Sequence, residues 1–366
     1  MRDIRQDMER FMASGQPFGR AVVTTVWGSA PRPAGACLLA DLGGTIAGSV
    51  SGGCVETAAA SEIAQAIDAG CPRLVEFGVT NERAWEVGLA CGGTIRLLIE
   101  PVVREEIMRA AGGPGGVVVA TVLESPAGIG AALIVDDTGL VAGPLPPVGA
   151  NVGTSDGGGA LLGELHSEIA SEALDALARA ASATAAYATS AGDSVVMFFE
   201  VYPREPKLVI FGGVHIAAAL VPMARMLGYR TIVADGREAF LTRDRFPDAD
   251  ELILGWPEAA FAQAELDSAT SVCVLTHAPK FDDPALLIAL RSPAAYVGAI
   301  GSRKTQQARR QRLKAAGLSD HELDRLHGPI GLDLGGREPA EIALAVLGEI
   351  IALRHGKGGP RRTEVS

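Results

Sequence analysis

Residues 207–235 decide the fold of the second half of the chain and read KLVIFGGVHIAAALVPMARMLGYRTIVAD. The first five residues are an apolar run typical of a buried strand, and two glycines follow it. An amphipathic helix is predicted over 216–227, ending at Gly228, and a second strand over 231–234. This order of strand, helix and strand is typical of a parallel sheet.

The same alternation continues toward the end of the chain. Further apolar strands are predicted at 271–275 and 295–300, and a helix begins at Pro339, a residue favoured in the first turn. We therefore predict an α/β fold whose carboxy-terminal part, residues 204–355, is a Rossmann-like doubly wound parallel sheet. Residues 356–366 are predicted to form a flexible tail.

The first half of the chain contains an internal duplication. VVTTV at 22–26 is echoed by VVATV at 118–122, and IRLLIE at 95–100 by VVMFFE at 195–200. Between these runs each copy carries an alanine-rich segment with the apolar spacing of a helix. The two predicted helices cover 55–69 and 167–181.

These repeats predict a duplicated, β-rich α+β domain over residues 1–203, with copies of about 1–104 and 105–203. Pro203 and Pro206 interrupt the pattern and mark its boundary with the following sheet. Two similar copies in one chain are compatible with a homodimer without requiring one.

Composition and charge exclude several classes of protein. A net charge of -11 and a pI near 5.1 would repel nucleic acid. The charged start lacks an apolar segment, and no apolar run approaches about 18 residues, so we expect a cytoplasmic protein without a membrane span. Five cysteines without a CxxC pair argue against a disulfide framework or a structural zinc site.

The glycine turn after the strand at 207–211 is the first candidate binding site. Gly212, Gly213 and His215 lie at its carboxyl end, and Asp235 ends the next strand, near the spacing of a ribose-binding acid. Val214 replaces a glycine of the dinucleotide fingerprint and would crowd a pyrophosphate, which argues against tight NAD(P) binding. A sheet of this type without a dinucleotide is the alternative.

Two later strands are followed by further candidate binding residues. At 301–303 a glycine, a serine and an arginine precede a predicted helix. This combination suits binding of a phosphate, and a simple helix cap with a solvated basic residue is the alternative. Thr276 and His277 follow another strand, where open sheets place ligands, and a structural histidine is the alternative. The predicted binding residues of this half are Gly212, Gly213, His215, Asp235, Arg237, Thr276, His277, Gly301, Ser302 and Arg303.

Cysteines in glycine-rich loops are the candidates for chemistry. Cys54 follows Gly52 and Gly53 and precedes a predicted helix, whose amino terminus lowers the pKa of a thiol. Cys91 precedes two further glycines, and soft sulfur ligands of this kind suit molybdenum or a persulfide carrier. Glu56 completes the predicted catalytic set, and Gly52 and Gly53 are predicted cofactor-binding residues. The alternative is that both cysteines are small buried apolar residues.

Several ordered motifs resemble one protein family, the XdhC/CoxI family of xanthine dehydrogenase accessory factors. The resemblance covers nearly the whole chain. Its motifs are GSAPRPAG at 28–35, GSVSGGCVE at 48–56, CGG at 91–93, LTH at 275–277, YVGAIGSR at 296–303, PIGLD at 329–333 and PAEIA at 339–343.

The resemblance implies binding of the molybdenum cofactor, molybdopterin, which the protein carries rather than uses. It further implies support for sulfuration of the cofactor and delivery to an apo molybdenum hydroxylase such as xanthine or carbon monoxide dehydrogenase, with a cysteine desulfurase-type sulfurtransferase as partner. Cys54 would be the candidate molybdenum contact. This favours a chaperone over a stand-alone enzyme. The alternatives are an NAD(P)-binding oxidoreductase and a structural adaptor between sulfurtransferase and target.

Overall fold

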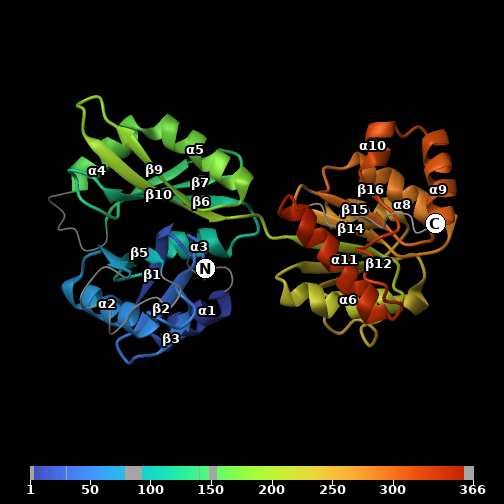
Figure 1. Ribbon diagram of the computed structural model, residues 1–366, viewed down its shortest axis with the longest axis horizontal. Helices are drawn as coiled ribbons and strands as arrows, with labels where there is room; N and C mark the ends of the chain where they lie inside the picture. Colours follow the sequence, from blue (N-terminus) through green and yellow to red (C-terminus); the bar gives the residue numbers. More distant parts are fainter. Residues whose placement is uncertain (1–3, 30, 79–92, 140, 148–154, 358–366) are drawn as a thin grey trace. The chain divides into compact units, whose positions relative to one another are not determined.

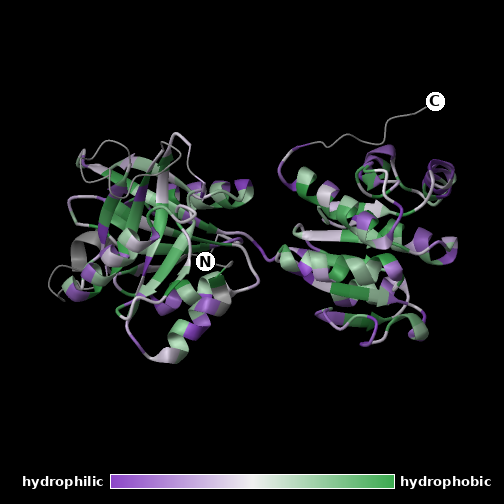
Figure 2. Ribbon diagram, turned by 60° about the horizontal axis from the view of Figure 1, so that its bottom comes forward, coloured by the Kyte–Doolittle hydropathy of each residue, from purple (hydrophilic) through white to green (hydrophobic). Residues whose placement is uncertain are grey.

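A computed structural model describes residues 4–29, 31–78, 93–139, 141–147 and 155–357. The chain forms two compact units, Met1–Arg204 and Glu205–Ser366 (Figure 1). In both units the strands are coloured mainly as hydrophobic, and polar residues gather on the outer helices (Figure 2). Each unit therefore has its own buried core.

The first unit contains two five-stranded antiparallel sheets with the same strand order, β3-β2-β1-β5-β4 and β8-β7-β6-β10-β9. The strands of the first sheet are β1 (Phe18–Trp27), β2 (Cys37–Asp41), β3 (Ile46–Gly48), β4 (Arg73–Phe77) and β5 (Thr94–Glu100). Those of the second are β6 (Val117–Glu124), β7 (Ala132–Asp136), β8 (Val141–Leu145), β9 (Ala183–Ala188) and β10 (Ser194–Tyr202). The identical order is the structural counterpart of the repeated sequence.

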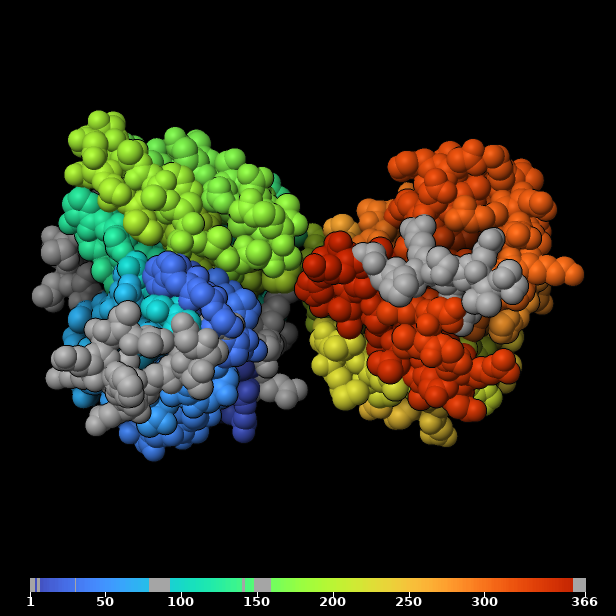
Figure 3. Space-filling view, viewed as in Figure 1, coloured from blue at the N-terminus to red at the C-terminus, as the bar shows by residue number. Residues whose placement is uncertain are grey.

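Four layers make up this unit. Helix α2 (Glu56–Ala69) packs on the outer face of the first sheet, and α5 (His166–Arg179) packs on the outer face of the second. The inner faces meet in a shared core, with Val22 and Leu98 from one sheet and Val119 and Phe198 from the other. Figure 3 shows the two repeats packed against each other, the first in blue and the second in green.

Some elements of this unit were not predicted. Each repeat has a strand, β4 or β9, that the sequence pattern did not reveal. The glycine-rich stretch before the second repeat helix forms α4 (Ser155–Glu164), although glycine disfavours helix. Helices α1 (Arg5–Ser14) and α3 (Glu105–Gly112) are also additional.

The second unit is a six-stranded parallel sheet in the order β13-β12-β11-β14-β15-β16. Its strands are β11 (Lys207–Phe211), β12 (Arg230–Asp235), β13 (Glu251–Leu254), β14 (Thr270–Val274), β15 (Tyr296–Ala299) and β16 (Leu326–His327). Its α-helices are α6 (His215–Met226), α7 (Pro257–Ala264), α8 (Pro279–Arg291), α9 (Arg303–Ala315), α10 (Asp320–Asp324) and α11 (Pro339–Arg354). Two hydrophobic clusters, one on each side of the sheet, show that it is doubly wound.

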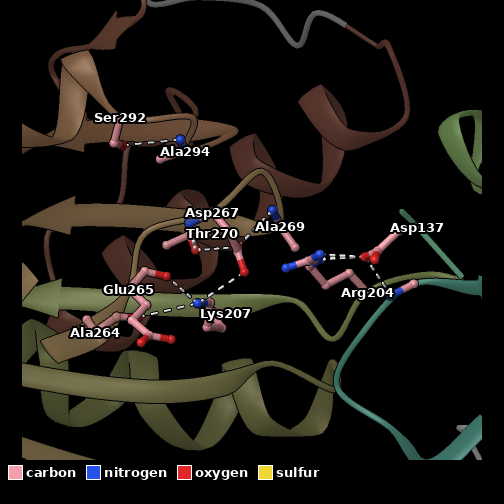
Figure 4. A network of polar contacts seen from close by, with 11 residues as sticks. Asp137, Arg204, Lys207, Ala264, Glu265, Asp267, Ala269, Thr270, Ser292 and Ala294 are labelled. Carbon is pink, nitrogen blue, oxygen red and sulfur yellow. Dashed lines mark hydrogen bonds and ion pairs between the residues drawn. The ribbon is translucent and has the colours of Figure 1, made fainter. Parts of the chain in front are cut away.

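Polar contacts fix the amino end of the central strand β11 (Figure 4). The ammonium of Lys207 lies 3.1 Å from a carboxylate oxygen of Asp267 and donates to the carbonyl of Glu265 at 2.5 Å. The hydroxyl of Thr270 donates to the same Asp267 carboxylate at 2.7 Å. These contacts hold β11 beside β14 at the edge opposite the candidate site.

The predicted fold class is confirmed: a duplicated, β-rich first part is followed by a parallel sheet of the Rossmann type. Among the described residues, no helix has the length and apolar character needed to cross a bilayer.

Candidate functional site

The carboxyl end of the parallel sheet contains a topological switch point between β11 and β14, because the helices that follow these two strands, α6 and α8, pack on opposite faces of the sheet. Gly212 and Thr276 meet there. A Cβ atom on Gly212 would lie 2.8 Å from the methyl carbon of Thr276, and the φ of Gly212 is +118°. The glycine is therefore required for the close approach of two loops.

Asp235, predicted to bind a ribose, is occupied within the protein. One oxygen accepts from the backbone N–H of Gly213 at 2.8 Å, and the guanidinium of Arg237 donates to both oxygens at 2.9 and 2.8 Å. Burial alone would raise the pKa of Asp235, but these hydrogen bonds outweigh it and hold that pKa below its ordinary value. The carboxylate is 1% exposed and serves to fix the glycine turn.

The side chain of Val214, the residue expected to crowd a pyrophosphate, is half-buried and packs against the hydrophobic cluster beside α6. His215 is the exposed first residue of α6. Arg237, besides holding Asp235, lies over the ring of Phe240, with its guanidinium carbon 3.8 Å from the ring centroid. The predicted cofactor residues around this turn are thus brought together mainly by contacts with one another.

A buried polar network lies on the other side of the switch point. The hydroxyl of Thr276 donates to Asp282, and Arg309 of α9 donates to the second carboxylate oxygen at 2.7 Å. Arg309 also donates to the carbonyl of Ile300 at 3.0 Å and to Gln306 at 2.7 Å. Burial raises the pKa of Asp282, and its two hydrogen-bond donors oppose that rise. The network connects β14, α8, β15 and α9.

Sequence reasoning missed Arg309 as a site residue. Helix α9 is rich in basic side chains, and a single sequence cannot show which of them turns inward. The structure shows that Arg309 is 1% exposed.

Gly301 and Ser302 precede α9, as predicted. Gly301 has a φ of +139°, which favours glycine, and the Ser302 hydroxyl accepts from the backbone N–H of Thr305 at 3.2 Å. Ser302 therefore caps the helix, and Arg303 is its first residue. The exposed His277 and the first turn of α9 line one side of a cavity between α8 and α9, with a volume of about 390 Å³.

In the first unit, the loop before α2 is organised around the carboxylate of Glu56. It accepts from the backbone N–H groups of residues 50–53 and 55 at 2.9–3.2 Å and from the hydroxyls of Ser49 and Ser51 at 2.6 and 2.7 Å. Burial opposes this charge, but the hydrogen bonds lower the pKa of Glu56 to about 2. Glu56 thus positions the loop around it.

Cys54 is exposed in this loop, and its backbone N–H donates to Ser51 at 3.0 Å. The N–H groups of residues 50–55 are therefore all used internally, by the carboxylate of Glu56 and the hydroxyl of Ser51. Gly52 and Gly53 have φ values of +86° and +123°, which give the turn its shape. Cys91 lies outside the described residues.

The predicted residues thus form two groups, one in each unit. The Cys54 loop presents a thiol on a rigid turn, and the carboxyl edge of the parallel sheet presents basic and polar groups beside a cavity. Among the described residues, no cluster of three or more His, Cys, Asp or Glu side chains could hold a metal ion.

Two models of one protein family match this chain. The model of the XdhC and CoxI family matches residues 11–78, and the model of the XdhC Rossmann domain matches residues 208–350. A crystal structure titled as a xanthine dehydrogenase from Bacillus halodurans superimposes with a TM-score of 0.71 at 24% identity, covering 99% of this chain and 97% of that one. That likeness shows the fold.

Three curated relatives are similar in sequence. The molybdenum cofactor insertion chaperone PaoD of Escherichia coli is 25% identical over 94% of this chain and 85% of its own. A protein of Bacillus subtilis, named as a probable xanthine dehydrogenase component, is 26% identical over 91% and 92%. YqeB of Escherichia coli is 30% identical, over 48% of this chain and only 32% of its own length.

The fold and the two groups define a two-unit α/β protein that joins a duplicated sandwich with a cysteine loop to a Rossmann-type unit. With both family models matched in order along the chain, it belongs to the XdhC and CoxI family.

Proposed function

We propose that this protein is an accessory chaperone of a molybdenum hydroxylase: it binds the molybdenum cofactor, supports its sulfuration and delivers it to the apo enzyme. The cofactor is cargo, and the partners are the apo hydroxylase, such as xanthine or carbon monoxide dehydrogenase, and a cysteine desulfurase-type sulfurtransferase. The observation that carries this proposal is the match along 94% of the chain to a relative named for cofactor insertion.

The thiol of Cys54 is the group that we assign to the cargo. It is exposed on a turn held by Glu56, and a fixed, accessible sulfur is a suitable soft ligand for molybdenum or an acceptor of persulfide sulfur. Because the loop N–H groups are used internally, the side chain alone would contact the cargo.

The test uses cofactor released from a molybdenum hydroxylase, incubated with purified full-length protein and separated by gel filtration. Retained pterin is oxidised and measured by fluorescence. We expect wild type to retain the cofactor and Cys54→Ala to retain about tenfold less, as for the loss of a metal contact. Cys71→Ala is the matched control, because Cys71 is also an exposed thiol of the first unit.

Retention by neither protein, or equal retention by Cys54→Ala and Cys71→Ala, would contradict the proposal. Delivery is measured separately, as hydroxylase activity gained by apo enzyme after addition of the loaded protein. A structural adaptor would instead bind its partners without retaining pterin, and Cys54→Ala would not affect that binding.

A further inference from the structure

Helix α11 presents an apolar side to solvent. Between Glu341 and Arg354 the helix has one charged residue, Glu349, and this residue is turned inward, where it accepts from the hydroxyl of Tyr296 at 2.6 Å. Leu344 is 58% exposed. Figure 3 shows the helix, in red, at the surface of the second unit. A surface helix ordinarily carries polar residues on its outer side, so an apolar outer side indicates a contact surface.

The outer side of α11 contains a row of residues spaced four apart, Ala340, Leu344, Gly348 and Ala352. Residues at this spacing lie in line on one face of a helix. The first two are exposed, and the last two are half-buried. The opposite side packs into the core through Ala343, Val346, Leu347 and Ile350. The helix is therefore apolar on both sides, and only one side is covered within the second unit.

The row combines a large side chain with a gap. Leu344 is the large residue, and Gly348, one turn later, has no side chain. A Cβ atom on Gly348 would lie 3.1 Å from a methyl carbon of Leu332, so Leu332 borders the gap. The gap is one helical turn away from the leucine that could fill it in a second copy.

A second copy of α11 fits this row in antiparallel orientation. A twofold axis at the level of Val346 brings Leu344 of each copy opposite Gly348 of the other. The same rotation brings Ala340 opposite Ala352, so that small residues meet at both ends. The row is thus complementary to itself in size and in register, as an interface of the isologous type requires.

The charges at the ends of α11 agree with the same arrangement. The helix begins directly after the exposed Glu338 and ends at the exposed Arg354. The twofold axis that brings Leu344 opposite Gly348 also brings Glu338 of one copy opposite Arg354 of the other. Opposite charges then meet at both ends of an antiparallel pair, whereas a parallel pair would place like charges together.

We propose that two copies of this chain associate through α11, in antiparallel orientation, about a twofold axis at the level of Val346. This interface does not depend on the function proposed above. A single pair of helices buries less surface than a standard protein interface, so the dimer is in reversible equilibrium with the monomer. We expect a dissociation constant on the order of 10 µM.

Sedimentation velocity of the full-length protein at about 1–100 µM measures the association. For wild type, the mass should rise with concentration from 37.7 kDa toward twice that value. Leu344→Glu should raise the dissociation constant by about a hundredfold, because it places an unpaired charge at the centre of the interface. Met226→Glu is the matched control, because Met226 is 81% exposed at the end of α6, outside the row. Circular dichroism confirms that each variant is folded.

Cross-linking measures the orientation of the two helices. The background is a full-length chain in which Cys54, Cys71 and Cys91 are replaced by serine. In this background, Ala340→Cys combined with Ala352→Cys should form a disulfide-linked dimer on mild oxidation, because these positions lie opposite each other in the pair. Ala340→Cys alone is the control and should stay without a cross-link.

Three results would overturn the proposal: a wild type that stays monomeric over this range, association that survives Leu344→Glu, or equal cross-linking of the single and double cysteine variants. A monomeric wild type whose binding to an apo hydroxylase is lost in Leu344→Glu would also overturn it. That result would assign the apolar side of α11 to the hydroxylase.

Discussion

At the scale of single residues, Glu56 has the clearest structural role. Its carboxylate accepts hydrogen bonds from the backbone N–H groups of the loop before α2. A glutamate at the first position of a helix ordinarily contributes a modest interaction with the helix dipole. Here its two oxygens accept from the backbone on both sides of Cys54, so that one side chain determines where the thiol lies.

The variant Glu56→Gln should therefore destabilise the first unit near neutral pH by about 1–3 kcal/mol. The folded pKa of about 2 lies below the ordinary value of 4.5, so the stabilisation is complete above that value. This stabilisation should be lost as the pH falls from about 4.5 to about 2. The free energies of unfolding of wild type and Glu56→Gln should then approach each other.

Urea unfolding of wild type and variant across this range provides the measurement. Glu62→Gln is the control, because Glu62 lies on the same helix in a partly exposed pair with Arg73 and should change stability by less than about 1 kcal/mol. A pH-independent difference for Glu56→Gln would show that the carboxylate charge is not the cause.

At the scale of elements, α9 depends on its first residues for two separate purposes. Ser302 caps the helix, and Lys304 and Thr305 line the cavity. The helix cap considered for this segment is therefore observed, and the anion site predicted there stays a prediction.

We predict that Ser302→Ala lowers the stability of the second unit by about 1 kcal/mol in phosphate-free buffer, since a backbone N–H loses its acceptor. Ser302→Asn should stay close to wild type, because asparagine is an equally good cap. Thermal unfolding compares the three proteins. Equal losses in both variants would mean that packing of the serine, and not capping, stabilises the helix.

At the scale of the whole molecule, the most informative feature is a buried ion cluster between the two sheets of the first unit. Arg20 of β1 donates to Glu100 at 2.5 Å and lies 3.0 Å from Glu200. The two glutamates occupy equivalent positions of the repeats. Burial opposes the charge of Arg20, but the carboxylates raise its pKa well above the ordinary value.

Arg20→Met should destabilise this unit by about 3–5 kcal/mol, because Glu200 loses its buried ion-pair partner and Glu100 keeps only Arg104, at 3.3 Å. Adding Glu200→Gln should recover part of the loss by removing a buried charge that Arg20 no longer balances. Hydrogen exchange by mass spectrometry measures this locally, as protection of β1 and β10. If the double variant is less protected than Arg20→Met, the cluster acts through hydrogen bonds rather than charge.

Much of the architecture was predictable because the patterns are local. The apolar run before the glycine turn gives β11 its observed bounds, and Pro339 begins α11 as expected. The strands that were missed have weak patterns: β9 is mostly alanine, a helix former, and becomes a strand only by pairing with β10.

By itself, the sequence determined the division into a duplicated part and a parallel sheet, the family, and the loops that carry Cys54, His277 and Gly301. Only the tertiary structure decided what those loops do with their polar groups. Asp235 and Glu56 accept from backbone N–H groups of neighbouring turns, and Arg309 turns inward to Asp282. Such pairings join positions up to 27 residues apart, and spacing along one chain does not specify which donor satisfies a buried acceptor.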